Sequence, residues 1–304
     1  MFRSQNFQQN ISRINTPTNY TKFIVFDNSL NLHVIDIASE SIDNSYNIPE
    51  LGVGYSCIAG NGVIAYTDYG GSKVHFISST TFGYLGNTAI DTYSWGVEYF
   101  NSKFWVCCNF NVDNIYIIDS VTFGIDATLT DTVRPTGISY GNNKMVVSSY
   151  TPSSVNSLYD ANSNSLITTV SNSNDNASAT GFGDGKFIIS NFLSDNVNII
   201  NSLTNSIITT ISVGTGPYGD KIGYGNGYFA VPNFSSSNVS IIQSSTNSVV
   251  ATVSTPTSPF NVAYGNGKFG VTTGANQVCF IDATTHTVLS NLNIGTTIYA
   301  ICAI

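Results

Sequence analysis

Charged side chains are scarce in this chain, and basic side chains are the scarcest. Only 9% of the 304 residues are charged, against about 25% in an average soluble domain. Arginine occurs only at Arg3, Arg13 and Arg134, and the formal net charge is −8. The sequence contains no basic patch. Binding to nucleic acid is therefore not expected, because affinity for a phosphate backbone requires clustered Lys and Arg.

Long apolar runs are also missing. No stretch approaches the roughly 18 apolar residues that a membrane-spanning helix needs. The first 19 residues lack the apolar segment of a classical signal peptide. Asn, Ser, Thr and Gly take the polar positions, which suits a protein of an outer surface. We therefore expect synthesis in the cytosol and a final location on a virion or at the cell surface, reached without a classical signal peptide.

Cysteine is infrequent and odd in number. The five cysteines are Cys57, Cys107, Cys108, Cys279 and Cys302. Each lies within a predicted strand among apolar neighbours, which favours small buried side chains over a disulfide framework. No Cys-x-x-Cys pair suggests a metal site.

A unit of about 41 residues recurs along the chain and predicts its fold. One strand of each unit ends at Asp36, Ser78, Asp119, Asp160, Asn201, Gln243 and Asp282. A tight turn is centred at Asn61, Asn101, Asn142, Asp184, Asn226 and Asn266. Two landmarks that keep one period, with four short strands in each unit, are typical of β-propeller blades. The sequence therefore predicts an all-β, seven-bladed β-propeller of four-stranded antiparallel blades.

The two ends of the repeat predict how the ring closes. The tail, Ile294–Ile304, matches the first strand of a unit, whereas Tyr20–Phe26 matches the second strand. The C-terminal strand should therefore join the N-terminal blade and cover its edge. The predicted blades are 51–90, 91–130, 131–170, 171–211, 212–253, 254–293, and a composite of 20–48 with 294–304. Residues 1–19 lie outside the propeller domain of residues 20–304, and we expect them to form an N-terminal arm that docks onto a partner.

One segment carries a resemblance to a known family. Val197–Gly219 reads VNIINSLTNSIITTISVGTGPYG, with a Val-x-Ile-Ile strand, a Thr-Asn-Ser turn and a Val-Gly-x-x-Pro lead into the next unit. This combination resembles the YVTN-type β-propeller repeat, whose family is also described as surface-layer or lactonase-like propellers. The resemblance extends over residues 20–304 and is strongest in the last three units. It implies a seven-bladed ring and no single function, because propellers carry many activities.

Aromatic residues recur where the innermost strands begin. The seven equivalent positions are Tyr55, Trp95, Thr136, Ser178, Tyr218, Phe260 and Tyr299. The ring geometry would gather the five aromatic residues, Tyr55, Trp95, Tyr218, Phe260 and Tyr299, near the mouth of the central channel. They could stack on a sugar or an apolar side chain, or they could only fill space between blades. The burial of the rings distinguishes these two alternatives.

Signals for catalysis are weak. Histidine occurs only at His33, His75 and His286. Charged residues near the inner strands are Glu98, Arg134, Asp220 and Lys221, of which the last two form a two-residue insertion that predicts a bulge. A metal site or a catalytic triad needs side chains that converge. No catalytic residue, metal or cofactor is predicted.

Three functions remain open at this level. The favoured one is a non-enzymatic interaction or scaffold protein on an outer surface, such as a structural or attachment component of a phage-like virion or a cell envelope. Its partners would be other proteins of a larger assembly, reached through residues 1–19, and a glycan or surface receptor. The alternative is a lactonase-like or lyase-like hydrolytic enzyme, which needs Glu98, Arg134, Asp220 and a histidine in one pocket. A solitary ligand carrier of the cytosol or periplasm fits the surface composition less well.

Overall fold

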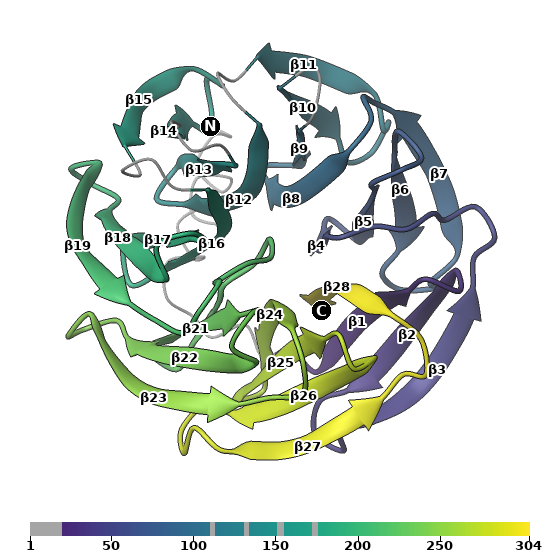
Figure 1. Ribbon diagram of the computed structural model, residues 1–304. Coiled ribbons are helices and arrows are strands. Elements are labelled where there is room, and N and C mark those ends of the chain that lie inside the picture. The colour runs from purple at the N-terminus through teal and green to yellow at the C-terminus, as the bar shows by residue number, and fades with distance from the viewer. Residues whose placement is uncertain (1–19, 110–112, 131–133, 151–154, 172–175) are drawn as a thin grey trace, which may run out of the picture.

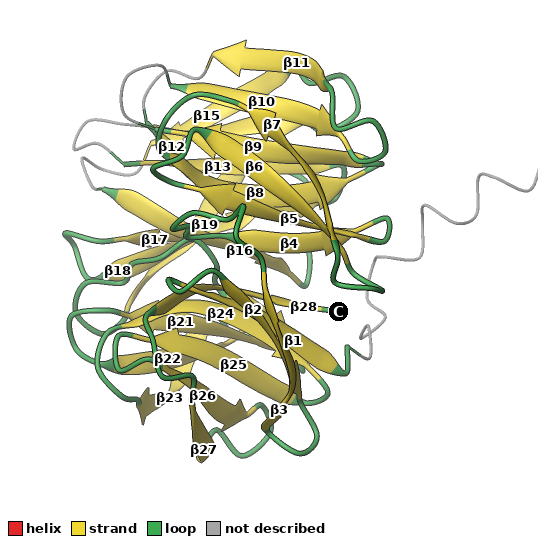
Figure 2. Cartoon of the chain, turned by 90° about the vertical axis from the view of Figure 1, so that its right-hand side faces the viewer, coloured by secondary structure: helices red, strands yellow, loops and turns green. Residues whose placement is uncertain are grey.

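Seven sheets arranged around a central axis make up the protein (Figure 1). The computed structural model describes residues 20–109, 113–130, 134–150, 155–171 and 176–304. These residues form 28 strands in seven four-stranded antiparallel sheets, and no helix occurs among them. The strands run between the two faces of a disc (Figure 2). The predicted seven-bladed β-propeller is confirmed.

Each blade contains four strands that are consecutive in the sheet. The composite blade has the order β28 (Ile298–Ala303), β1 (Lys22–Asp27), β2 (Asn31–Asp36) and β3 (Ser41–Asn47). The second contains β4 (Cys57–Gly60), β5 (Val63–Asp68), β6 (Lys73–Ser78) and β7 (Tyr84–Ala89). The third contains β8 (Ser94–Phe100), β9 (Lys103–Cys108), β10 (Asn114–Asp119) and β11 (Ile125–Thr130). The fourth contains β12 (Pro135–Gly141), β13 (Lys144–Ser149), β14 (Val155–Asp160) and β15 (Leu166–Ser171).

The remaining three blades follow the same order from the axis outward. The fifth contains β16 (Ala177–Gly183), β17 (Lys186–Asn191), β18 (Asn196–Asn201) and β19 (Ser206–Ser212). The sixth contains β20 (Gly223–Gly225), β21 (Tyr228–Asn233), β22 (Asn238–Gln243) and β23 (Ser248–Ser254). The seventh contains β24 (Pro259–Gly265), β25 (Lys268–Thr273), β26 (Gln277–Asp282) and β27 (Val288–Asn293). The predicted blade boundaries agree with these strands to within one residue.

The ring closes through the C-terminal strand, as predicted. β28 pairs antiparallel with β1, and Ile24 lies opposite Cys302. The backbone N–H groups of Thr21 and Lys22 both donate to the carbonyl oxygen of Ile304, at 3.1 and 3.2 Å. This pairing removes two free sheet edges. Residues 1–19, the predicted docking arm, lie outside the described residues, so the arm stays a prediction.

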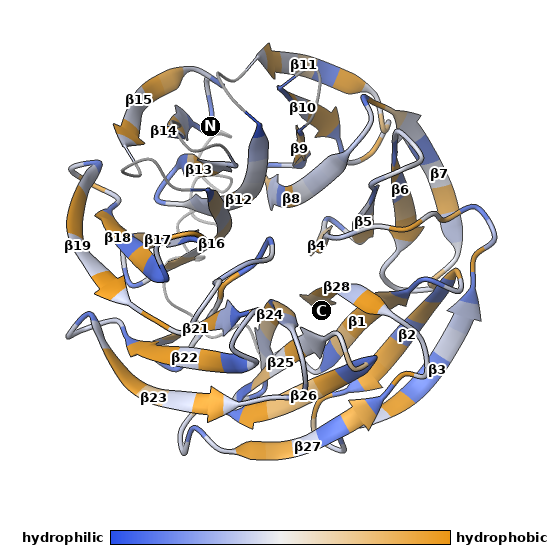
Figure 3. Cartoon of the chain, in the orientation of Figure 1, coloured by the Kyte–Doolittle hydropathy of each residue, from blue (hydrophilic) through white to orange (hydrophobic). Residues whose placement is uncertain are grey.

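The hydrophobic core lies between neighbouring blades. One cluster joins Ile24 and Leu32 of the composite blade to Ile64 and Tyr66 of the second blade. Middle strands are covered on both sides, so β5 is buried at all six positions, whereas β7 at the rim alternates between partly buried and exposed residues. Apolar residues are accordingly found in all blades (Figure 3). The core therefore supports a rigid frame whose faces carry the loops.

A β-bulge marks the start of the innermost strands. In the third blade, Trp95 and Gly96 lie opposite the single residue Cys107. The fourth blade repeats the arrangement, and there the N–H of Gly137 donates to Ser148 Oγ at 2.8 Å. A bulge leaves one backbone group without a ladder partner, and this hydroxyl supplies one. In the third, seventh and composite blades the first bulged residue is aromatic, at Trp95, Phe260 and Tyr299.

Candidate ligand-binding face at the channel mouth

The five predicted aromatic residues come together in one cluster. Tyr55 stacks on Trp95 with ring centroids 4.6 Å apart and lies 4.9 Å from Tyr299. Phe260 contacts Tyr299 at 5.1 Å and Tyr218 at 5.7 Å, and the Trp95–Tyr218 separation of 5.9 Å completes the circuit. Several pairs adopt the edge-to-face geometry that aromatic quadrupoles favour. The geometry is thus as expected, whereas ligand binding by these residues stays a prediction.

Burial divides the cluster into two groups. Trp95 and Phe260 are 7% and 3% exposed, so their rings mainly pack against neighbours. Tyr55, Tyr218 and Tyr299 are only partly buried. Burial raises the pKa of Tyr55, with a further contribution from Tyr299, and burial likewise raises the pKa of Tyr218. The hydroxyl groups of Tyr55 and Tyr218 therefore stay protonated at neutral pH and can donate hydrogen bonds.

A second set of aromatic residues, not predicted from the sequence, surrounds the first. Its members directly follow the second strand of their blade and are Tyr69, Tyr150, Phe192 and Phe234. Tyr69 lies 4.9 Å from Tyr55, and Phe192 lies 5.3 Å from Tyr218. All four are partly buried. The sequence pattern that could have predicted this second set is an aromatic residue at one fixed position after the second strand of a blade. The repeated Asn-Phe pairs at 191–192 and 233–234 show this pattern.

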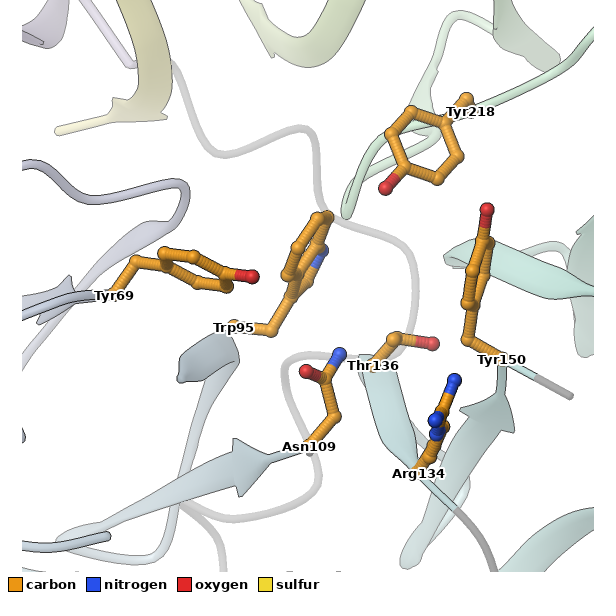
Figure 4. Close-up of a pocket in the computed structure, with 7 residues that line it drawn as sticks. All are labelled: Tyr69, Trp95, Asn109, Arg134, Thr136, Tyr150 and Tyr218. Atoms are coloured by element: carbon orange, nitrogen blue, oxygen red, sulfur yellow. The ribbon is translucent and has the colours of Figure 1, made fainter. Parts of the chain in front are cut away.

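A recess opens where the inner aromatic set is interrupted (Figure 4). Two neighbouring blades carry the small residues Thr136 and Ser178 at the aromatic position, and the recess lies between Trp95 and Tyr218. Its volume is about 100 Å³. The lining residues are Tyr69, Trp95, Asn109, Arg134, Thr136, Tyr150 and Tyr218. We call this feature the aromatic recess.

Hydrogen-bond donors are plentiful in the aromatic recess. Trp95 Nε1 is buried and has no hydrogen-bond partner within the described part of the chain. Figure 4 shows this nitrogen on the side of the indole that faces Thr136 and Tyr150. Arg134 adds a guanidinium group, and no Asp or Glu belongs to the lining. A buried N–H without a partner costs free energy, so the site is suited to a ligand that accepts a hydrogen bond.

Below the mouth, the predicted insertion blocks the channel. Residues 218–222 lie opposite only two residues of β21, 231–232, so Asp220 and Lys221 enlarge the bulge seen in other blades. The enlarged loop projects toward the axis (Figure 1). The backbone oxygen of Asp220 accepts from Thr180 N at 3.0 Å, and its N–H donates to Asn261 Oδ1 at 2.8 Å. The insertion thus joins the fifth, sixth and seventh blades.

The side chains of the insertion reach blades across the ring. Asp220 Oδ2 accepts a hydrogen bond from Ser56 of the second blade. Lys221 Nζ lies 3.0 Å from Glu98 Oε2 of the third blade and donates to the carbonyl oxygen of Ile138 at 2.8 Å. Burial is the largest influence on Asp220 and raises its pKa to about 6, although Lys221 and Ser56 act in the opposite direction. Ordered charges therefore plug the channel.

The residues of the hydrolytic alternative do not converge. Glu98 and Asp220 face the channel, whereas Arg134 lines the aromatic recess. His33 Nε2 lies 3.0 Å from Asp27 Oδ2 inside the composite blade, and His75 is bound in the same way to Asp68 in the second blade. Within the described ranges, no group of three His, Cys, Asp or Glu is placed to hold a metal ion. His33 and His75 therefore have structural contacts, whereas His286 packs against the ring of Tyr228 in the seventh blade's outer turn, far in sequence from the other two.

Several solved structures are similar to this chain in fold. Apo AztD from Citrobacter koseri is similar with a TM-score of 0.62 and 12% identity, over 93% of this chain and 97% of that one. The dihydro-heme d1 dehydrogenase NirN, solved in complex with DHE, has a TM-score of 0.63 and 12% identity, over 92% of this chain and 65% of that one. The computationally designed Ika8 protein has a TM-score of 0.68 and 9% identity, over 94% and 92%. At such identities the likeness establishes the fold alone.

Sequence comparisons add no family. No model of a known protein family matches the chain, and no curated protein matches it. The YVTN type of the repeat therefore stays a prediction, while the class of protein is a seven-bladed β-propeller. No helix long and apolar enough to cross a membrane occurs in the ranges that the structure describes.

Proposed function

We propose that this protein is a non-enzymatic β-propeller that binds partners through the aromatic face at its channel mouth, as an interaction or attachment component of a virion or cell envelope. The observation that carries the proposal is the joining, on one face, of two sets of aromatic rings, of which all but Trp95 and Phe260 are partly exposed. Aromatic side chains are enriched where proteins bind partners, because they bury large areas and keep a polar edge. Loops on a rigid frame are also where binding usually resides.

The blocked channel supports binding over catalysis. A hydrolytic site needs an acid, a base or a nucleophile beside a space for substrate. Glu98 is paired with Lys221, and Asp220 is fully buried against Ser56. The recess itself is lined by aromatic, amide, hydroxyl and guanidinium groups without a carboxylate. This inventory suits recognition of a ligand better than its chemical conversion.

The outer-surface location rests on composition and is tested by fractionation. An antibody against the full chain would be used on separated cytosolic, envelope and released-particle fractions of the source cells. We expect the protein in the particle or envelope fraction. Recovery in the cytosol alone would overturn the location. Deletion of residues 1–19 should release the protein from its assembly, and unchanged incorporation would refute a docking role for that arm.

A turnover assay tests the hydrolytic alternative. Purified full-length protein would be incubated with simple γ- and δ-lactones, and ring opening would be followed by acid release. We expect no rate above buffer. Turnover that Glu98→Gln or Asp220→Asn abolishes would replace the binding proposal with the enzymatic one, because these two residues would then act on a substrate.

A further inference from the structure

We infer that the aromatic recess binds a proline-rich segment of a partner protein, with a proline ring between the aromatic walls and a backbone carbonyl oxygen accepting from Trp95 Nε1. This inference rests on the proposed binding function and names the chemistry of the partner. Arg134 also lines the recess but already has an interaction partner, so we assign the ligand no contact with its guanidinium group.

Trp95 Nε1 is the group of the recess that most needs a ligand. The side chain is 7% exposed, and its N–H has no acceptor among the described residues. An indole nitrogen donates and cannot accept, so only an acceptor satisfies it. Figure 4 shows this nitrogen on the side of the indole that faces Thr136 and Tyr150, which also line the recess. A ligand that brings an acceptor into the recess therefore relieves the cost of a buried, unpaired N–H.

This donor favours a proline-containing backbone over other acceptors. A peptide carbonyl oxygen only accepts, whereas a sugar hydroxyl also brings an O–H that needs an acceptor of its own. The lining offers no carboxylate, the strongest acceptor, for such hydroxyl groups. Most residues would also bring a backbone N–H that loses its water in the recess, but proline has none. A prolyl segment therefore satisfies Trp95 without leaving a new group unpaired.

The walls and the size of the recess suit one small ring. Trp95 and Tyr150 stand on opposite sides, and Tyr218 closes a third side (Figure 4). The Tyr218 hydroxyl is hydrogen-bonded to Tyr150, and the two rings meet edge to face with centroids 5.8 Å apart, so these walls hold each other in place. Pockets for drug-sized ligands measure about 300–1,000 Å³, whereas this recess measures about 100 Å³. A pyrrolidine ring matches that space better than a pyranose with its hydroxyl groups.

The aromatic surface continues beyond the recess, as an extended ligand requires. Phe192 and Phe234 lie 5.3 and 6.0 Å from Tyr218, and both are partly buried. A polyproline II helix is extended, has no internal hydrogen bonds and repeats every three residues over about 9 Å. Residues next to the bound proline would therefore lie over these outer rings. Because this helix forms before binding, little conformational entropy is lost when an aromatic groove binds it.

Matched peptides provide the test on the full-length chain. The probes are octaproline, octasarcosine and a Gly-Ser repeat of the same length, each acetylated and amidated. Octasarcosine keeps the tertiary amide carbonyl groups without the proline ring, and the Gly-Ser peptide has neither feature. Titration followed by calorimetry should give saturable binding of octaproline and at least about ten-fold weaker binding of the other two. Equal binding of octasarcosine and octaproline would overturn the role of the ring.

A glycan is the main competing class of ligand, and chitotriose represents it. Its acetamide groups also present a carbonyl oxygen beside a ring, so it matches the recess better than other neutral sugars do. We expect no saturable binding of chitotriose. Saturable binding of chitotriose without binding of octaproline would assign the recess to a glycan and overturn the inference.

Variants locate the binding. Trp95→Phe keeps an aromatic ring and removes the N–H, and should weaken octaproline binding about five- to ten-fold. Tyr150→Ala removes one wall and should weaken it by a similar factor. The matched controls are Trp105→Phe, at a tryptophan buried in the core, and Tyr46→Ala, at a partly buried tyrosine of the outer strand β3. Both controls should bind octaproline as the unchanged protein does.

Tryptophan fluorescence gives a second, local readout. The chain has two tryptophans, so Trp95 alone emits in Trp105→Phe and Trp105 alone emits in Trp95→Phe. Octaproline should change the emission of Trp105→Phe and leave that of Trp95→Phe unchanged, because Trp105 is buried in the core. The reverse pattern would place the peptide away from the recess.

Two further outcomes would refute the site. One is the absence of saturable octaproline binding, and the other is binding that neither Trp95→Phe nor Tyr150→Ala reduces. Circular dichroism checks the fold of each variant, and Tyr150→Ala, at a partly exposed position after β13, carries the test if Trp95→Phe does not fold. Fractionation reports on the proposed function independently. A surface protein that ignores octaproline would refute only the ligand, whereas a cytosolic protein that binds it would refute only the location.

Discussion

The carboxyl group of Asp220 is fully buried inside the channel, and this burial should make the stability of the protein depend on pH. Asp220 is 0% exposed, and burial raises its pKa from 3.8 to about 6. Its Oδ1 has no hydrogen-bond partner in the described structure, so ionisation is poorly compensated there. The perturbation is Asp220→Asn, which removes the titrating group and keeps the shape of the side chain. Lys221, Ser56 and Glu98 are the neighbours that modulate the charge.

The direction in which stability changes with pH follows from whether the folded or the unfolded state binds more protons. Because the pKa of Asp220 is raised on folding, the folded state binds more protons than the unfolded state between pH 3.8 and about 6. The stabilisation is therefore complete below pH 3.8 and is lost as the pH rises through the folded value. A shift of about two units corresponds to about 3 kcal/mol in total, of which about 2 kcal/mol falls between pH 4.5 and 7.5.

Denaturant unfolding at several pH values provides the assay. The free energy of unfolding would be measured for the unchanged protein and for Asp220→Asn. At each pH, the value of the variant would be subtracted from that of the unchanged protein. Other carboxyl groups cancel in this difference, because both proteins contain them. The difference should fall by about 2 kcal/mol from pH 4.5 to 7.5. A difference that stays constant would refute the raised pKa and the uncompensated burial of Asp220.

Three further predictions concern the frame. Deleting Ile298–Ile304 removes a strand with several buried apolar side chains and exposes the edge of β1, so the shortened chain should not fold as a monomer. Thermal unfolding provides the measurement, and an unchanged melting temperature would contradict ring closure by the C-terminal strand. Lys221→Met leaves Glu98 without its partner and should cost about 3 kcal/mol, most of which a second change, Glu98→Gln, should restore in unfolding experiments. The five thiols are buried, and burial raises the pKa of Cys279 to about 12, so Ellman's reagent at pH 8 should detect none before denaturation and five after it.

The sequence predicts the frame well because the repeat records local chemistry. The turn at Asn226 and Gly227 has positive φ at both residues, 52° and 83°, which only a few residue types tolerate in a two-residue hairpin. Such turns recur at the blade period in six blades, and the seventh blade is the one split between the two chain ends. The match between Lys22-Phe23 and Lys268-Phe269 likewise predicts the split blade, because β1 and β25 both begin at the lysine.

The site is only partly visible in the sequence, because it depends on contacts between distant blades. The inner aromatic set keeps a fixed register at the bulge, so its convergence follows from the repeat. The outer set escapes prediction because loops after the second strand vary, and only their first residue keeps the register. The pairing of Lys221 with Glu98, 123 residues apart, depends on how far the insertion reaches across the axis. No local pattern encodes that distance.

The channel plug and the aromatic recess both depend on the close contact of Gly96 with Thr136 and Asp220. A side chain at Gly96 would place its Cβ 2.3 Å from the Thr136 carbonyl oxygen and 2.7 Å from Asp220 Oδ1, so glycine is required there. Gly96 directly follows Trp95, and Asp220 lies two residues after Tyr218, so both walls of the recess lie close in sequence to the contact between Gly96 and the plug. Moving the plug would therefore displace Trp95 and Tyr218. The contacts of the buried plug thus help to fix the positions of the two aromatic walls of the recess.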